Sequence, residues 1–201
     1  MTRIKICGIK TVADALFCVE TGADAVGLVF AESPRKVDLD TARRICASLP
    51  PFVSRIGVFV DVELDVVAHI ARFCGLTALQ FHGSESAAYC RSFSMPVLKA
   101  IRVRSAADIA GIAGFPATAF VLDAYHGQLA GGTGAVFDWS LAQTPLSRPV
   151  VLAGGLNAKN VNEAVLQVKP YAVDVSSSVE TNGEKDRQKI RAFIEAVRRC
   201  A

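Results

Sequence analysis

The sequence has no long run of basic residues and only a small excess of them. Its 201 residues include 22 lysines and arginines against 19 aspartates and glutamates, which gives a formal net charge of +3. A nucleic-acid-binding surface needs a concentrated basic stripe, so this class of partner is not expected. Protein partners are left undetermined. A small anionic ligand is more compatible with this weak net positive charge, although charge alone does not establish one.

The six cysteines form no metal-binding pattern. No two of them stand in a C-x-x-C pair and no histidine cluster accompanies them, so a zinc site is not expected. Cys18, Cys46, Cys74 and Cys90 lie among apolar residues with helical spacing, where a free cysteine behaves as a small hydrophobic residue. We therefore expect a reducing cytoplasm rather than an oxidising compartment.

No targeting or membrane-spanning segment is expected. Met1–Arg3 lead directly into an apolar run, without the regions of a signal peptide, and no apolar stretch is long enough to cross a bilayer. No low-complexity segment or interdomain linker is visible. Because 51% of the residues are apolar and 20% are charged, the chain has enough apolar material for a large core. We expect residues 1–201 to form a single domain.

What the chain does contain is a repeated alternation of apolar runs and amphipathic stretches. The runs predict buried parallel strands at Ile4–Ile9, Ala25–Phe30, Arg55–Val60, Ala78–Phe81, Pro96–Ile101, Ala119–Leu122, Pro149–Ala153 and Ala172–Val175. The stretches predict helices at Thr11–Thr21, Asp40–Leu49, Glu63–Cys74, Glu85–Phe93, Ser105–Ala113, Asp138–Ala142, Ala158–Val168 and Glu184–Arg199. Eight such units predict a (β/α)8 TIM barrel. The alternative is an open doubly wound sheet, which often carries a G-x-G-x-x-G turn that this sequence lacks.

Two residues suited to acid–base chemistry stand at or near the carboxyl ends of predicted strands. They are Cys7 and Asp123, and barrel enzymes carry their reactive groups at this end of the strands. A thiol and a carboxyl so placed are candidates for the base and the acid of a proton transfer. Lys5 shares a strand face with Cys7, and its ammonium would favour the thiolate. The alternatives are a buried hydrophobic cysteine and an aspartate that forms an Asx-turn.

Loops rich in glycine and serine follow the last three predicted strands. Barrel enzymes often bind phosphate between the loops after strands seven and eight, and glycine lets backbone N–H groups approach an anion closely. The alternative is ordinary turn chemistry. These loops contain Gly132, Thr133, Gly134, Gly154, Gly155, Ser177 and Ser178.

Four further polar residues lie near predicted strand ends. Arg35 can fork onto a carboxylate, and Gln80 and His82 share a strand face and would line the barrel mouth as substrate-binding residues. A solvated arginine and a structural histidine are the alternatives. Lys99 leaves a second reaction class open, a lyase that forms a Schiff base, unless it makes an ion pair inside the barrel.

Seven segments occur together, in order, in one known family. They are Lys5–Ile9, Ser33–Arg35, Leu79–Gly83, Leu122–Ala124, Gly131–Gly134 with Phe137–Trp139, Ala153–Asn157 and Asp174–Ser177. With them the chain resembles the phosphoribosylanthranilate isomerases of tryptophan biosynthesis over essentially its whole length.

This resemblance implies a (β/α)8 barrel that performs an Amadori rearrangement. A sugar-phosphate substrate, N-(5-phosphoribosyl)anthranilate, becomes 1-(2-carboxyphenylamino)-1-deoxyribulose 5-phosphate without a metal or an organic cofactor. By the same resemblance Cys7 is the general base, Asp123 the general acid, and Arg35 a positioning residue near the anthranilate end. The resemblance also implies a phosphate site formed by Gly132–Gly134, Gly154–Gly155 and Ser177–Ser178. A phosphate-binding barrel that has lost activity is the non-enzymatic alternative, and the presence of both Cys7 and Asp123 argues against it.

One position departs from the family pattern. Ser178 stands where the family commonly has glycine. Serine resists a positive φ, so the change either weakens phosphate binding or adds a hydroxyl contact.

Overall fold

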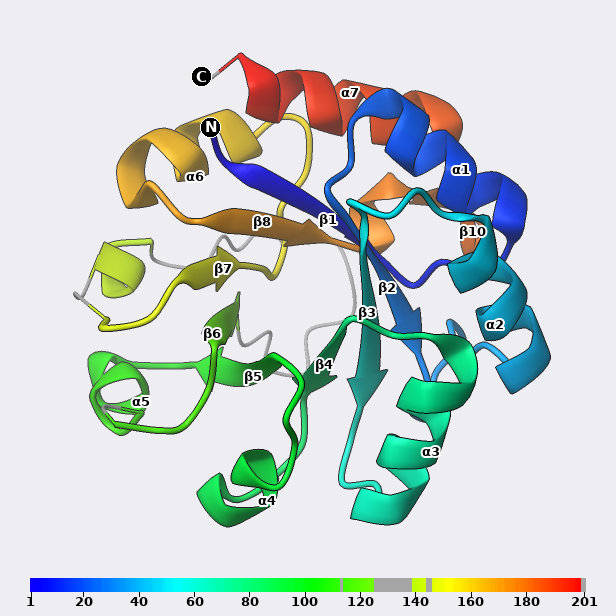
Figure 1. Ribbon diagram of the computed structural model, residues 1–201. Helices are drawn as coiled ribbons and strands as arrows, with labels where there is room; N and C mark the ends of the chain where they lie inside the picture. Colours follow the sequence, from blue (N-terminus) through cyan, green and yellow to red (C-terminus); the bar gives the residue numbers. More distant parts are fainter. Residues whose placement is uncertain (113, 125–138, 144–145, 200–201) are drawn as a thin grey trace.

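The structure, a computed structural model, describes residues 1–112, 114–124, 139–143 and 146–199. At its centre is a closed barrel of eight parallel strands (Figure 1). The strands are β1 Arg3–Cys7, β2 Ala25–Val29, β3 Ser54–Phe59, β4 Ala78–Phe81, β5 Val97–Val103, β6 Ala119–Ala124, β7 Val150–Leu152 and β8 Ala172–Val175. Each strand pairs with the next, and β8 returns to pair with β1. The predicted (β/α)8 barrel is confirmed.

Helices follow the strands and surround the barrel (Figure 1). They are α1 Val12–Thr21, α2 Leu39–Ser48, α3 Leu64–Cys74, α4 Ala87–Arg91, α5 Ala106–Ala110, α6 Val161–Val168 and α7 Arg187–Arg198, with 3-10 helices η1 Leu141–Gln143 and η2 Ser177–Val179. The Thr11 hydroxyl caps α1 by accepting from the N–H of Asp14, and Gly22 ends it with a φ of 113°. Within the described ranges, no helix is long and apolar enough to cross a membrane.

Two element boundaries differ from the predicted ones, and both affect residues near the site. The helix predicted at Glu85–Phe93 begins only at Ala87, because Ser86 has extended backbone angles and caps it by accepting from the N–H of Tyr89. Glu85 thus lies before the helix, where its buried carboxylate accepts hydrogen bonds from backbone N–H groups and from Lys99. Strand β6 continues to Ala124, so Asp123 lies within the strand rather than after it. The helix predicted at Asp138–Ala142 begins outside the described residues, and the described part after β6 is the 3-10 helix η1.

The chain also departs from the predicted pattern after β8. The spacing predicts a helix from Glu184, but a short antiparallel hairpin of β9 (Glu180–Thr181) and β10 (Glu184–Lys185) precedes α7. Asn182 and Gly183 form its turn with φ values of 53° and 80°. This conformation favours an Asn-Gly pair, so the turn was a signal for a hairpin that the helical pattern obscured.

The barrel interior combines small apolar side chains with buried charge. Six alanines and four larger apolar residues form one inner cluster, while the main core lies between the barrel and the helices. Two lysine–carboxylate pairs are also buried: Lys5 Nζ lies 2.7 Å from Asp174 Oδ2, and Lys99 Nζ lies 2.8 Å from Glu85 Oε2. Since a buried charge without a partner is costly, each of these lysines is held by its carboxylate.

Candidate active site

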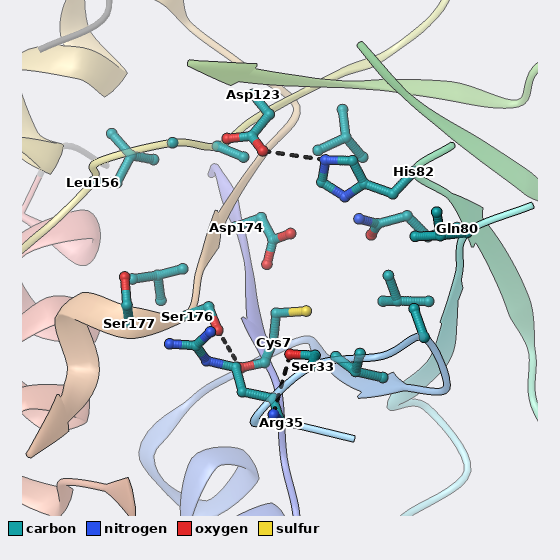
Figure 2. Close-up of a pocket in the computed structure, with 18 of the residues that line it drawn as sticks. Cys7, Ser33, Arg35, Gln80, His82, Asp123, Leu156, Asp174, Ser176 and Ser177 are labelled. Carbon is teal, nitrogen blue, oxygen red and sulfur yellow. Dashed lines mark hydrogen bonds and ion pairs between the residues drawn. The ribbon is translucent and has the colours of Figure 1, made fainter. Parts of the chain in front are cut away.

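A cavity of about 490 Å³ opens at the carboxyl end of the barrel, and Figure 2 shows side chains that line it. Nine of the residues predicted for the site line this cavity: Cys7, Arg35, Gln80, His82, Asp123, Gly154, Gly155, Ser177 and Ser178. The other three, Gly132, Thr133 and Gly134, lie outside the described residues. The structure thus brings together residues that are up to 171 positions apart in the sequence.

Cys7, at the end of β1, is buried beside a charged pair. Lys5 Nζ donates to Asp174 Oδ2 at 2.7 Å. A Cβ on neighbouring Gly27 would lie 2.7 Å from Cys7 Sγ and 3.1 Å from Lys5 Nζ, so the thiol and the ammonium border the same small space. Burial raises the pKa of Cys7, the Lys5 charge lowers it and the Asp174 charge raises it, with a net upward shift. The expected stabilisation of the thiolate by Lys5 is present, but burial outweighs it.

Arg35 is fixed in the cavity wall rather than solvated. Its Nε and Nη2 donate to the two carboxylate oxygens of Glu180 at 2.8 and 2.7 Å. Burial acts to raise the pKa of Glu180, but hydrogen bonds from Arg35 and Lys185 lower it overall. Gly8 makes this position possible, because a Cβ there would lie 2.6 Å from Arg35 Cδ. The predicted fork onto a carboxylate is therefore made within the chain.

Asp123 contacts one of the other predicted site residues. Its Oδ2 lies 3.2 Å from His82 Nε2, and the two side chains are about a quarter exposed, at 29% and 24%. In Figure 2 Asp174 lies between Asp123 and Cys7. A ligand that reaches both Asp123 and Cys7 must therefore pass over Asp174.

Two buried acceptors in the cavity wall lack partners. Within the described part of the chain, Gln80 Oε1 and Asp174 Oδ1 have no hydrogen-bond partner, and both residues line the cavity. Buried polar atoms are nearly always paired, so these two oxygens mark places where hydrogen-bond donors of a ligand can bind. Sequence reasoning assigned a site role to Gln80 but missed Asp174. Its place opposite Lys5 depends on the register between β1 and β8, which only the folded barrel shows.

The loops after β7 and β8 meet at the edge of the cavity. Gly154 and Gly155 have φ values of 79° and 67°, and their N–H groups donate to no described backbone carbonyl. The Ser178 hydroxyl donates to the carbonyl of Leu156, which joins the two loops. Ser178 is not among the residues with positive φ, so serine causes no backbone strain here. Its hydroxyl is already engaged rather than free to add a ligand contact.

Lys99 does not lie in the cavity wall. Its Nζ donates to Glu85 Oε2 at 2.8 Å, to the carbonyl of Gly83 at 2.6 Å and to that of Phe81 at 3.5 Å. Schiff-base formation needs a neutral, accessible amine, so this arrangement favours the ion-pair alternative over a lyase. Among the described residues, no group of three or more histidines, cysteines or carboxylates is placed to hold a metal ion.

The comparisons with known proteins agree with one another. The family model of N-(5'-phosphoribosyl)anthranilate (PRA) isomerase matches residues 4–196. The chain belongs to this family. An N-(5'-phosphoribosyl)anthranilate isomerase of Pseudomonas aeruginosa is 52% identical over 200 residues, which cover 98% of this chain and 95% of that protein. The resemblance inferred from the sequence is confirmed.

Solved structures of phosphoribosyl anthranilate isomerases superpose closely on this chain. The crystal structure from Thermotoga maritima is 42% identical with a TM-score of 0.90, and covers 98% of this chain and 99% of that one. A second structure, 41% identical with a TM-score of 0.88 and the same coverage, is a complex with reduced 1-(o-carboxyphenylamino)-1-deoxyribulose 5-phosphate.

Proposed function

We propose that the protein is a phosphoribosylanthranilate isomerase of tryptophan biosynthesis. It converts N-(5-phosphoribosyl)anthranilate to 1-(2-carboxyphenylamino)-1-deoxyribulose 5-phosphate. The observation that carries the proposal is that the motif residues Cys7, Arg35 and Asp123, from three different strands or loops, line one cavity at the carboxyl end of the barrel. The related structure that holds a reduced form of this product supports the same ligand class.

We also place the protein in the cytoplasm as a single domain. Cys7, Cys18, Cys46, Cys74 and Cys90 are free and buried, which supports a reducing compartment. The pairing of β1 with β8 near opposite ends of the chain supports one domain over residues 1–201.

The first step opens the sugar ring. Protonated Asp123 delivers its proton to the ring oxygen, the bond between C1 and that oxygen breaks, and the nitrogen lone pair forms a C1=N double bond. The result is a protonated Schiff base and an Asp123 carboxylate. Contact with His82 at 3.2 Å holds the carboxyl group in place for this transfer.

The second step moves the double bond. The Cys7 thiolate removes the proton on C2, the C–H electron pair forms a C1=C2 bond, and the imine electron pair returns to nitrogen. The aminoenol then gains a proton on C1 and loses its hydroxyl proton, which gives the ketone. A proton returned by Cys7 and one taken up by Asp123 restore the site, so the chemistry uses only groups of the chain and the substrate.

Each charged end of the substrate has matching groups at the cavity mouth. The loops after β7 and β8 offer backbone N–H groups of Gly154 and Gly155 to the phosphate. Arg35 lies beside the β8 loop, where its Nε and Nη2 donate to Glu180, and we assign its Nη1 group to the anthranilate carboxylate. The sugar then spans the distance between Cys7 and Asp123.

Gly155→Ala should raise KM on the order of tenfold and change kcat much less, because the added Cβ obstructs the approach of the phosphate to the backbone. Gly75→Ala is the matched control. Gly75 has a φ of 70° against 67° for Gly155, but it ends α3 and does not line the cavity. Both variants should lose about 1 kcal/mol of unfolding free energy through backbone strain. Steady-state kinetics separate them, and an equal KM for both variants would contradict the phosphate site.

A fluorescence assay tests the proposed function. Phosphoribosylanthranilate is formed enzymatically from anthranilate, and the loss of its fluorescence is followed after the purified protein is added. We expect saturable turnover that persists after dialysis against a chelator. Substrate loss no faster than in buffer would refute the activity, and turnover that returned only with a divalent ion would refute the acid–base mechanism.

A further inference from the structure

The Lys5 ammonium lies between two groups that can each carry a negative charge, Asp174 and Cys7. We propose that Asp174 holds Lys5 while the site is empty, and that a sugar hydroxyl donating to the free Asp174 Oδ1 releases Lys5 to stabilise the Cys7 thiolate. Asp174 thereby couples sugar binding to activation of the base. This inference deepens the proposed function and rests on Cys7 being the base.

The first support is the geometry of the pair. Lys5 and Asp174 are only 2% and 8% exposed, so water cannot solvate either charge. They stand opposite each other in the β1–β8 register and are joined through Asp174 Oδ2 at 2.7 Å. Charges interact more strongly in such a buried setting than in water. One ammonium cannot fully compensate a carboxylate and a thiolate together.

The second support is the unpartnered oxygen. Asp174 Oδ1 is buried without a partner among the described residues, and Asp174 lines the cavity between Cys7 and Asp123. The phosphate and the carboxylate of the substrate are anions, which a carboxylate repels. The sugar hydroxyls are neutral donors, and the sugar is the part of the substrate that must cross this point.

Both acids show the effect of sharing one cation. Burial raises the pKa of Cys7, and the Asp174 charge adds to that increase. Burial likewise raises the pKa of Asp174, even though Lys5 acts to lower it. A hydrogen bond donated to Asp174 offsets part of its negative charge and weakens its attraction for Lys5. The Lys5 ammonium then stabilises the Cys7 thiolate more strongly.

The other charges that face Cys7 are already committed. Lys185 donates to Glu180 at 2.6 Å and to the carbonyl of Ser176 at 3.1 Å, and Arg35 forks onto the same Glu180 carboxylate. The neighbouring strand β2 presents Gly27, which has no side chain. The Lys5–Asp174 pair is therefore the part of this environment that a sugar can change.

The test is the Asp174→Asn variant in two measurements. The first follows alkylation of Cys7 by iodoacetamide against pH without substrate, with the Cys7 peptide quantified by mass spectrometry. Loss of the carboxylate charge should lower the midpoint of the alkylation rate against pH by about one pH unit or more. The second compares the pH profiles of kcat/KM and kcat, which report the free and the substrate-bound enzyme. In the wild type the midpoint of the kcat profile should lie at a lower pH than the midpoint of the kcat/KM profile. In Asp174→Asn the two midpoints should coincide, and kcat should be reduced.

Two further variants keep the test decisive. Lys5→Met should raise the alkylation midpoint, which gives an answer if Asp174→Asn fails to fold. Glu85→Gln removes the carboxylate of a buried lysine pair that does not border Cys7 and should leave the midpoint unchanged. An unchanged or higher midpoint in Asp174→Asn, or a wild type whose two kinetic midpoints coincide, would overturn the inference. Because alkylation needs no turnover, its outcome is separable from a failure of the proposed function.

Discussion

Replacing Cys7 by serine should lower kcat by on the order of a hundredfold or more and leave the barrel folded. An alcohol is a far weaker base than a thiolate, so removal of the proton on C2 becomes slow. The fold should survive because Cys7 belongs to a small apolar cluster with Val29 and Val58 rather than to the main core. Steady-state kinetics with thermal unfolding followed by circular dichroism measure both effects.

Cys18→Ser is the matched control for this substitution. Cys18 is buried in α1, burial raises its pKa to about 12, and it does not line the cavity. It should lose stability while keeping turnover. A Cys7→Ser protein with near-wild-type kcat would rule out Cys7 as the base.

Asp123→Asn should lower kcat by about 10²- to 10⁴-fold with little change in KM. The amide matches the carboxyl in shape but cannot deliver a proton to the ring oxygen. His82 retains a possible acceptor at the same position, so the local geometry should persist. Steady-state kinetics over a range of substrate concentrations separate the two parameters.

The control for this prediction is Asp24→Asn. Asp24 accepts hydrogen bonds from the N–H of Ile4 and from Arg198 and does not line the cavity, so its loss should leave kcat unchanged. An Asp123→Asn enzyme with a raised KM and an intact kcat would make Asp123 a binding residue instead of the acid.

Local signals in the sequence were enough to predict the barrel. Apolar runs located all eight strands, and Thr11 and Gly22 marked both ends of α1 because capping chemistry is local. The cavity residues followed from one further rule, that the carboxyl ends of parallel strands meet at one face. Cys7 and Asp123 could therefore be placed together without knowledge of their contacts.

The partners of these residues could not be predicted in the same way. Lys5 meets Asp174 only because β1 pairs with β8 in a particular register. Glu180 reaches Arg35 from β9 of a hairpin that the helical pattern obscured. The protonation of Cys7 depends on burial and on how one ammonium is shared, and both are properties of the folded interior.

A crystal structure of this protein with the reduced product analogue tests most directly whether the substrate spans the barrel mouth between base and acid. We expect the phosphate at Gly154 and Gly155, the anthranilate carboxylate at Arg35, and the sugar between Cys7 and Asp123 with a hydroxyl on Asp174. A phosphate bound at Arg35, or a sugar out of reach of Cys7, would contradict this arrangement.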